Sequence, residues 1–151
     1  MKTFASVDDL QAAIGQHLGY SDWHVVDQHR IDEFADATGD HQWIHVDPEK
    51  AKAGPFGTTI AHGYLTLSLI PWLMSEVTAY EGVKMGINYG ANKVRFPAPV
   101  RVDSRVRAGA EITGVEDVGN GGVQIVTRVT IEVDGQEKPS CVAETVARMY
   151  F

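Results

Sequence analysis

The feature that most constrains the fold is a stretch from Ala61 to Val77 that is apolar on nearly every side. A helix that is apolar all round is a buried helix. Pro71 lies within the stretch and should either kink the helix or end one helix and start another. The stretch is too short and too interrupted by polar residues to span a membrane. The rest of the chain is therefore expected to pack around it.

The second half of the chain alternates between apolar and polar residues. Residues 100–108 and 123–133 follow this pattern, which is typical of half-buried antiparallel strands. Gly119-Asn120-Gly121-Gly122 is a hairpin signal between these two strands. Further strands are predicted for Ile87–Phe96 and for Cys141–Tyr150. Together these segments predict an antiparallel sheet.

The first half carries the signals of three short helices. Ser6 precedes an apolar pattern that stops at Gly15, and Asp27 precedes a second pattern that stops at Gly39. A polar residue before the first turn and a glycine after the last are ordinary helix boundaries. Asp47-Pro48 opens a third helix, because proline is tolerated at the first helical position.

These segments predict one α+β domain spanning residues 1–151, since neither a repeat nor a linker divides the chain. The economical arrangement is a curved antiparallel sheet wrapped around a long central apolar helix. The edge strands of such a sheet need cover or a partner. We therefore expect a dimer.

Composition narrows the classes of function. The net charge of −7 argues against nonspecific nucleic-acid binding, although a local basic patch remains compatible with an anionic ligand. The single cysteine, Cys141, allows no internal disulfide, and its place in a predicted strand favours a buried bystander over a nucleophile. The N-terminus lacks the apolar segment of a signal peptide. We expect a cytoplasmic protein that is not associated with membranes.

Polar residues that can carry chemistry concentrate between Gly39 and Gly63. Asp40 follows the helix-ending glycine, and His45 lies five residues further on. A carboxylate and an imidazole at such a bend can each accept a hydrogen bond from one water and carry a proton near neutral pH. The alternative is that Asp40 caps the next turn and His45 is a partly buried structural histidine.

Other reaction classes find little support. His41 and His45 have the spacing of metal ligands on a helix, but the intervening chain is not helical in pattern and nothing nearby completes a site. No metal is expected. The chain also lacks a serine-centred nucleophile elbow and a phosphate-binding glycine loop after a strand.

His62-Gly63 stands at the predicted start of the apolar helix. Free backbone N–H groups and the helix dipole favour a developing negative oxygen there. Glycine also lets a ligand approach the backbone closely. The alternative is a glycine that merely begins a helix.

Four stretches, taken together and in order, resemble a known family. They are Ala37-Thr38-Gly39-Asp40, Ile44-His45-Val46-Asp47, Ile60-Ala61-His62-Gly63, and the segment from Asn88 to Val100. The chain resembles the MaoC-like hydratases, and more narrowly the single-domain (R)-specific enoyl-CoA hydratases of the hot-dog fold. One departure is Gln42-Trp43, where the family often has Asn-Pro.

The resemblance implies a hydro-lyase that reversibly adds water to trans-2-enoyl-CoA to form (R)-3-hydroxyacyl-CoA. It implies that Asp40 and His45 hold and activate the water, and that the backbone N–H of Gly63 polarises the thioester carbonyl. It also implies a homodimer that needs no cofactor or metal. The substrate-binding candidates are Gln42, His62, Tyr64, Asn88, Lys93 and Arg95.

The residues that would contact the CoA phosphates and the acyl chain are not settled by the sequence. The phosphates of CoA need basic residues, and the candidates are Lys93, Arg95, Arg101, Arg105 and Arg107, unless these form a solvated strand face. Tyr64, Leu67 and Ile70 either line an acyl channel or belong to the core. Two competing functions are an acyl-CoA thioesterase on the same fold and a non-catalytic acyl-thioester-binding subunit.

Overall fold

The computed structural model describes residues 1–151 and contains eight strands and six helices. The strands are β1 (Lys2–Phe4), β2 (His17–Tyr20), β3 (His24–Val26), β4 (Thr78–Tyr80), β5 (Met85–Arg95), β6 (Ser104–Gly119), β7 (Gly122–Val133) and β8 (Cys141–Tyr150). The helices are α1 (Val7–Ala12), α2 (Gln28–Thr38), α3 (Trp43–Val46), α4 (Pro48–Lys52), α5 (Gly63–Ser68) and α6 (Ile70–Met74).

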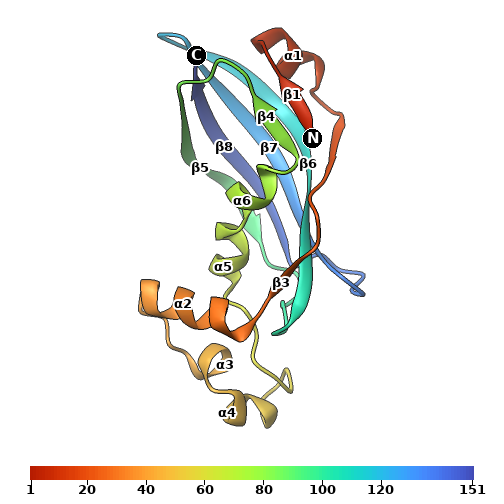
Figure 1. Ribbon diagram of the computed structural model, residues 1–151, viewed down its shortest axis with the longest axis vertical. Helices are drawn as coiled ribbons and strands as arrows, with labels where there is room; N and C mark the ends of the chain where they lie inside the picture. The colour runs from red at the N-terminus through yellow and green to blue at the C-terminus, as the bar shows by residue number, and fades with distance from the viewer.

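The main sheet has six strands in the order β2-β6-β7-β8-β5, with β3 also pairing with β6. All of its pairings are antiparallel, whereas β1 and β4 form a separate parallel pair. Helices α5 and α6 lie against one face of the curved sheet, and α2, α3 and α4 gather beyond the end at which α5 begins (Figure 1). This confirms the α+β, hot-dog arrangement.

The helix boundaries follow from the predicted caps. The Ser6 side chain accepts a hydrogen bond from the Asp9 N–H, and the Asp27 side chain accepts one from the Arg30 N–H. Gly39 ends α2 in the left-handed conformation, with φ of 82°. These side chains satisfy N–H groups that lack partners inside the helix. The three predicted helices are therefore confirmed.

The central apolar stretch forms two successive helices and not one long helix, which is one of the two outcomes expected of Pro71. Helix α5 ends at Ser68 and α6 begins at Ile70, with Pro71 in its first turn. Proline cannot donate to the preceding turn, so it starts the second helix rather than continuing the first. The outer side is not buried in the single chain, because Tyr64 is 70% exposed and Trp72 is 39% exposed.

The strand predictions are confirmed for β5, β7 and β8, and the hairpin turn lies between Gly119 and Gly122. The start of β6 was predicted too early. Residues 100–103 form an isolated bridge from Arg101 to Ile60 and a turn in which Asp103 has φ of 65°. Alternation also arises in a turn whose apolar residues face the core, which explains the error.

The core lies between the sheet and the two central helices. Its fully buried members include Ile112 and Ile125 from the sheet and Leu73 from α6. Cys141 belongs to this core, and burial raises the pKa of its thiol to about 11. A thiol with such a pKa is protonated and unreactive at neutral pH, so the reading of Cys141 as a buried bystander is confirmed.

Strand β5 forms an open edge of the sheet. It pairs only with β8, and all but one of its eleven residues are exposed. Exposed strand edges are templates for pairing with another chain. None of the helices is long and apolar enough to cross a membrane.

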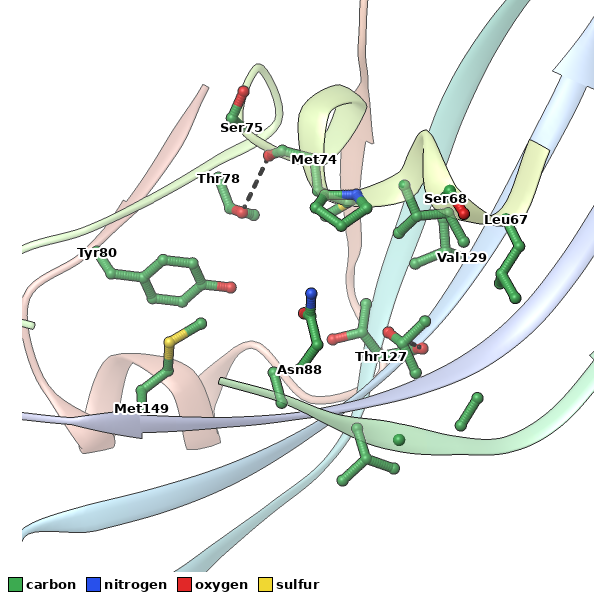
Figure 2. A pocket seen from close by; sticks show the side chains of 17 residues that line it. Leu67, Ser68, Met74, Ser75, Thr78, Tyr80, Asn88, Thr127, Val129 and Met149 are labelled. Carbon is green, nitrogen blue, oxygen red and sulfur yellow. Dashed lines mark hydrogen bonds between the residues drawn. The ribbon is translucent and has the colours of Figure 1, made fainter. Parts of the chain in front are cut away.

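A cavity of about 590 Å³ lies between α5, α6 and part of the sheet (Figure 2). Side chains from both helices and from β4, β5, β7 and β8 line it, including Leu67, Ile70, Tyr80, Asn88, Ala91 and Val129. Figure 2 shows Tyr80, Asn88 and Thr127 directed into this space. The lining is therefore mainly apolar, with a few polar groups.

Replacing Gly39 by Ala should destabilise the protein by about 1–2 kcal/mol, the usual cost of a left-handed residue that carries a Cβ. An added Cβ would meet no atom within 4 Å, so the effect comes from the backbone alone. Urea unfolding measures it. Gly39→Asn is the matched control, and its stability should fall by less, because asparagine tolerates the left-handed conformation. Equal stability of Gly39→Ala and wild type would contradict the prediction.

Candidate active site

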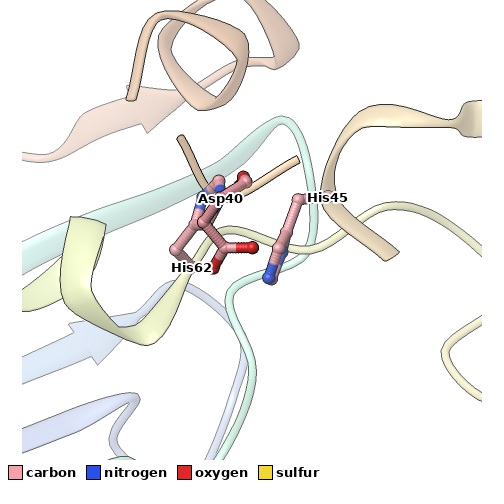
Figure 3. A group of neighbouring side chains, drawn as sticks. All are labelled: Asp40, His45 and His62. Atoms are coloured by element: carbon pink, nitrogen blue, oxygen red, sulfur yellow. The ribbon is translucent and has the colours of Figure 1, made fainter. Parts of the chain in front are cut away.

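Three side chains converge beyond the end of the sheet: Asp40, His45 and His62 (Figure 3). One potential ligand atom from each lies within 4.8 Å of the others. They come from the turn after α2, from α3, and from the residue before α5. The close approach of Asp40 and His45 is what the resemblance implied, whereas the place of His62 beside them was not anticipated.

Asp40 lies where the chain turns from α2 toward α3. Its carboxylate accepts a hydrogen bond from the Gln42 N–H at 3.3 Å, and the residue is exposed. Asp40 thus shapes the turn, as the structural alternative proposed. Because a carboxylate has several acceptor positions, this contact leaves it free to bind a water as well.

His45 is held from both sides. The residue is 7% exposed, and its Nδ1–H donates to the Ile60 carbonyl at 2.7 Å. The Gln28 side chain donates to the His45 carbonyl at 2.7 Å and accepts from the Thr59 hydroxyl at 2.6 Å. These bonds fix the ring so that Nε2 keeps its lone pair, as an acceptor requires.

Burial lowers the pKa of His45 below its ordinary value of 6.5. The hydrogen bond to Ile60 and the charge of Asp40 act in the opposite direction, whereas His62 adds to the lowering. A neutral imidazole at physiological pH can accept a proton. The environment therefore favours the form of His45 that a general base needs.

His62 is almost fully buried, at 2% exposure. Its Nε2–H donates to the backbone carbonyl of Asp40 at 2.9 Å. Its ring stacks on His45 with centroids 3.8 Å apart and planes 25° apart, and Phe34 packs against it at 5.0 Å. A direct contact with substrate would need exposure that this ring lacks, so His62 is not placed as a binding residue.

The three groups contain two imidazoles and a carboxylate, a donor set that transition metals accept. A metal bonds to imidazole nitrogen along the lone pair, in the plane of the ring. The two rings are stacked, with centroids 3.8 Å apart and planes 25° apart. The donor set is compatible with proton transfer as well as with metal binding.

Gly63 is the first residue of α5 and follows His62 directly. A Cβ at this position would lie 2.9 Å from the Phe96 ring, so glycine lets Phe96 close over the backbone. The backbone N–H of a first helical residue has no partner within the helix. Because α5 has only six residues, we attribute any oxyanion contact to this N–H and not to a helix dipole.

The remaining substrate-binding candidates are dispersed. Gln42 is exposed before α3, Tyr64 is exposed on α5, and Asn88 faces the cavity. Leu67 and Ile70 line the cavity. Tyr64 does not, and its ring lies edge-on to the Phe96 ring with the two centroids 6.1 Å apart.

The basic candidates divide into paired and free residues. Arg105 is paired with Asp134, and Arg107 pairs with Glu132 at 2.8 Å. Lys93 and Arg95 are exposed on β5 and make no ion pair with a side chain. Arg101 is likewise exposed and makes no ion pair, and its Nε–H donates to the Phe56 carbonyl at 3.4 Å. Lys93, Arg95 and Arg101 are therefore the basic candidates that no carboxylate of the chain already neutralises.

Sequence inspection did not reveal Gln28, Phe34 and Phe96 as parts of the site. Gln28 and Phe34 lie on a helix whose pattern indicated only an apolar face, and Phe96 ends a predicted strand. The only available signal was the proximity of Phe96 to two prolines. The contacts themselves join residues that are far apart in the chain.

Comparisons with known proteins identify the family of the chain. Residues 9–134 match the family described as MaoC like domain. The chain is 61% identical to 3-hydroxyacyl-thioester dehydratase Z of Mycobacterium tuberculosis over 148 residues, which is 98% of both chains. It is 43% identical to nodulation protein N of Rhizobium leguminosarum, over 97% of this chain and 92% of that protein.

Among solved structures, the (R)-hydratase from A. caviae involved in PHA biosynthesis shares 25% identity and a TM-score of 0.69, over 89% of this chain and 94% of that one. A monoamine oxidase regulatory protein from Archaeoglobus has a TM-score of 0.80 at 22% identity, over 99% and 97%, which shows the fold. The fold and site thus define a hot-dog protein of the hydratase and dehydratase class. The chain belongs to the MaoC-like dehydratase family.

Proposed function

We propose that the protein reversibly adds water to a trans-2-enoyl thioester and forms the (R)-3-hydroxyacyl thioester. The observation that carries this proposal is the convergence of the Asp40 carboxylate and the His45 imidazole, two acceptors beside the first residue of α5. The family assignment and the dehydratase and hydratase names of the relatives support a hydro-lyase.

In the proposed reaction, one water bridges the Asp40 carboxylate and His45 Nε2. One member of the pair takes a proton from this water while the hydroxyl adds to C3 of the substrate. A proton from the pair then reaches C2 on the same face, so the addition is syn and the site returns to its starting state. The proton taken from the water is the one returned to C2, so the pair carries a single proton in transit and needs no other source, which suits a general acid–base pair.

Gly63 completes the proposed site. Addition at C3 moves negative charge to the thioester oxygen, and a backbone N–H aimed at this oxygen stabilises the charge in the transition state. Because the charge is larger in the enolate-like transition state than in the substrate, the contact accelerates the reaction rather than merely tightening binding.

The cavity between α5 and the sheet is the proposed acyl site. It begins at Leu67, one helical turn beyond Gly63, so an acyl chain whose carbonyl sits at Gly63 can continue into it. Its volume and mainly apolar lining suit an alkyl chain. For a CoA substrate, Lys93 and Arg95 are the proposed phosphate contacts.

We further propose a homodimer in which a second copy covers β5 and the exposed side of α5. The exposed strand edge and the large apolar residues Tyr64, Ile87 and Tyr89 lie on this surface. Open edges and large exposed apolar groups are features of interfaces.

The first test follows crotonyl-CoA by its enoyl absorbance with the purified protein. Loss of absorbance without free thiol is the expected result. Release of free thiol instead would identify a thioesterase, whose water attacks the carbonyl. Inactivity of the purified protein alone would favour the non-catalytic subunit.

Asp40→Asn and His45→Gln should each lower kcat by about 10²-fold or more, the usual contribution of a general acid or base. Both side chains keep a similar size, so circular dichroism should show an intact fold. A matched control is Asp36→Asn, because Asp36 is exposed near the same turn and pairs only with His41. Near-full activity of either site variant would rule out the assigned pair.

The oligomer is tested by sedimentation or light scattering. The expected mass is about 33 kDa, twice the 16.5 kDa of one chain. Replacing Tyr89 by Pro should shift the mass toward one chain, because proline in an edge strand cannot donate to a partner strand. A wild-type protein of 16.5 kDa at micromolar concentration would refute the dimer.

Ala91 offers a test of the acyl site. It lines the cavity from the exposed strand β5, so Ala91→Leu fills cavity space without entering the core. The expected result is a loss of kcat/KM for longer enoyl chains of about 10-fold, with crotonyl-CoA little affected. One extra methylene in a pocket changes discrimination by about 10–200-fold, which sets this scale. An unchanged chain-length profile would place the acyl chain elsewhere.

A further inference from the structure

His62 combines three features that the proposed water-holding pair does not explain. It is buried, it bonds to the main chain of Asp40, and it stacks on His45. It also leaves Nδ1 buried without a hydrogen-bond partner. Unpaired buried polar atoms cost free energy and are rare in folded proteins. A leucine would fill the same space without this cost, so the imidazole serves some purpose other than packing.

The contact with Asp40 supplies one purpose. Gly39 and Asp40 form an exposed turn, and the Asp40 carboxylate accepts a hydrogen bond only from the Gln42 N–H of the same loop. The His62 Nε2–H donates to the Asp40 carbonyl from the segment that leads into α5. This bond ties the loop that carries the carboxylate to the helix that begins with Gly63.

The contact with His45 supplies another purpose. At a ring separation of 3.8 Å, two positive charges repel strongly even at the effective dielectric of protein sites. The other charged group acting on His45 is Asp40. Helix α2 presents the uncharged Phe34 to His62, and its Asp32 and Asp36 are bonded to Gln28 and His41.

We propose that His62 is a positioning residue: it anchors the Asp40 main chain and, by stacking on His45, restricts the two imidazoles to at most one positive charge. The substrate contacts would then belong to Asp40, His45 and Gly63, with His62 acting through the first two. This role rests on the proposed hydration reaction, but its effect on the two imidazoles is measurable without any substrate.

Two substitutions separate the anchoring role from the electrostatic role. His62→Gln keeps an N–H donor at about the distance of Nε2 but removes the titratable ring. His62→Leu keeps apolar bulk against Phe34 and removes the donor. His41→Gln is the matched control, because His41 lies in the same loop, is exposed, and bonds only to Asp36 among side chains.

With crotonyl-CoA, His62→Leu should lower kcat by about 10²-fold with KM changed by less than about threefold, since a small misplacement of a catalytic group costs this much. His62→Gln should recover most of kcat, and His41→Gln should match wild type. A fully active His62→Leu, or a loss confined to KM, overturns the positioning role. A His62→Gln as slow as His62→Leu overturns the anchoring bond.

The pH profile of kcat/KM tests whether the two imidazoles are restricted to one positive charge. Protonation of His45 removes its acceptor and stops the reaction, so the acidic limb reports this event in the free enzyme. Without a repelling neighbour His45 binds a proton more readily, and the acidic limb of His62→Gln should move to higher pH. An acidic limb that stays at the same pH or moves to lower pH overturns the restriction to one positive charge.

An NMR titration of the wild-type imidazole Cε1–H signals needs neither substrate nor an altered chain. The signals of His45 and His62 should each respond to the protonation of the other ring, as coupled sites do. Independent titration overturns the proposal even where the variants fail to fold. Coupled titration in a protein that does not hydrate crotonyl-CoA would refute the proposed function alone.

Discussion

One hydrogen bond, from the His62 imidazole to the Asp40 carbonyl, joins the two segments on which the site depends. The first segment runs from the end of α2 through α3 and carries Asp40 and His45. The second leads into α5 and supplies the Gly63 N–H. Neither segment holds the geometry alone, because the Asp40 turn is exposed and α5 is only six residues long. The buried stack of His45 and His62 reinforces the same connection.

The sheet places these segments without contributing a group to the Asp40–His45–His62 cluster. Its six antiparallel strands form a curved surface on which α5 and α6 pack, and this packing sets where α5 begins (Figure 1). The break at Pro71 allows two short helices to follow the curve, where a straight helix would diverge from it. The same curvature leaves the cavity between helices and sheet. The site and the cavity are thus two consequences of one packing arrangement, separated by one turn of α5.

Local signals predicted much of the fold. Ser6, Asp27 and Gly39 bound helices because their side chains or backbone conformations satisfy helix ends within a few residues. Strand β7 followed from alternation of apolar and polar residues. The early start assigned to β6 was an error, because the apolar pattern reports burial, which a turn can satisfy as well as a strand. The same kind of pattern left open whether the central stretch is one kinked helix or two helices, and packing decided for two.

The sequence by itself determined the local elements, the glycine that turns the chain before Asp40, and the spacing of Asp40, His45 and Gly63, because all of these depend on neighbours along the chain. Only the tertiary structure decided that His62 lies buried between Phe34 and His45, that Phe96 closes over Gly63, and that Arg105 and Arg107 are already paired. These contacts join segments 17 or more residues apart, and periodicity along a chain carries no information about which distant side chains will meet. The Asp40–His45 pair was visible as a pattern, but the burial and the tautomer of His45 and the place of His62 beside it came from packing.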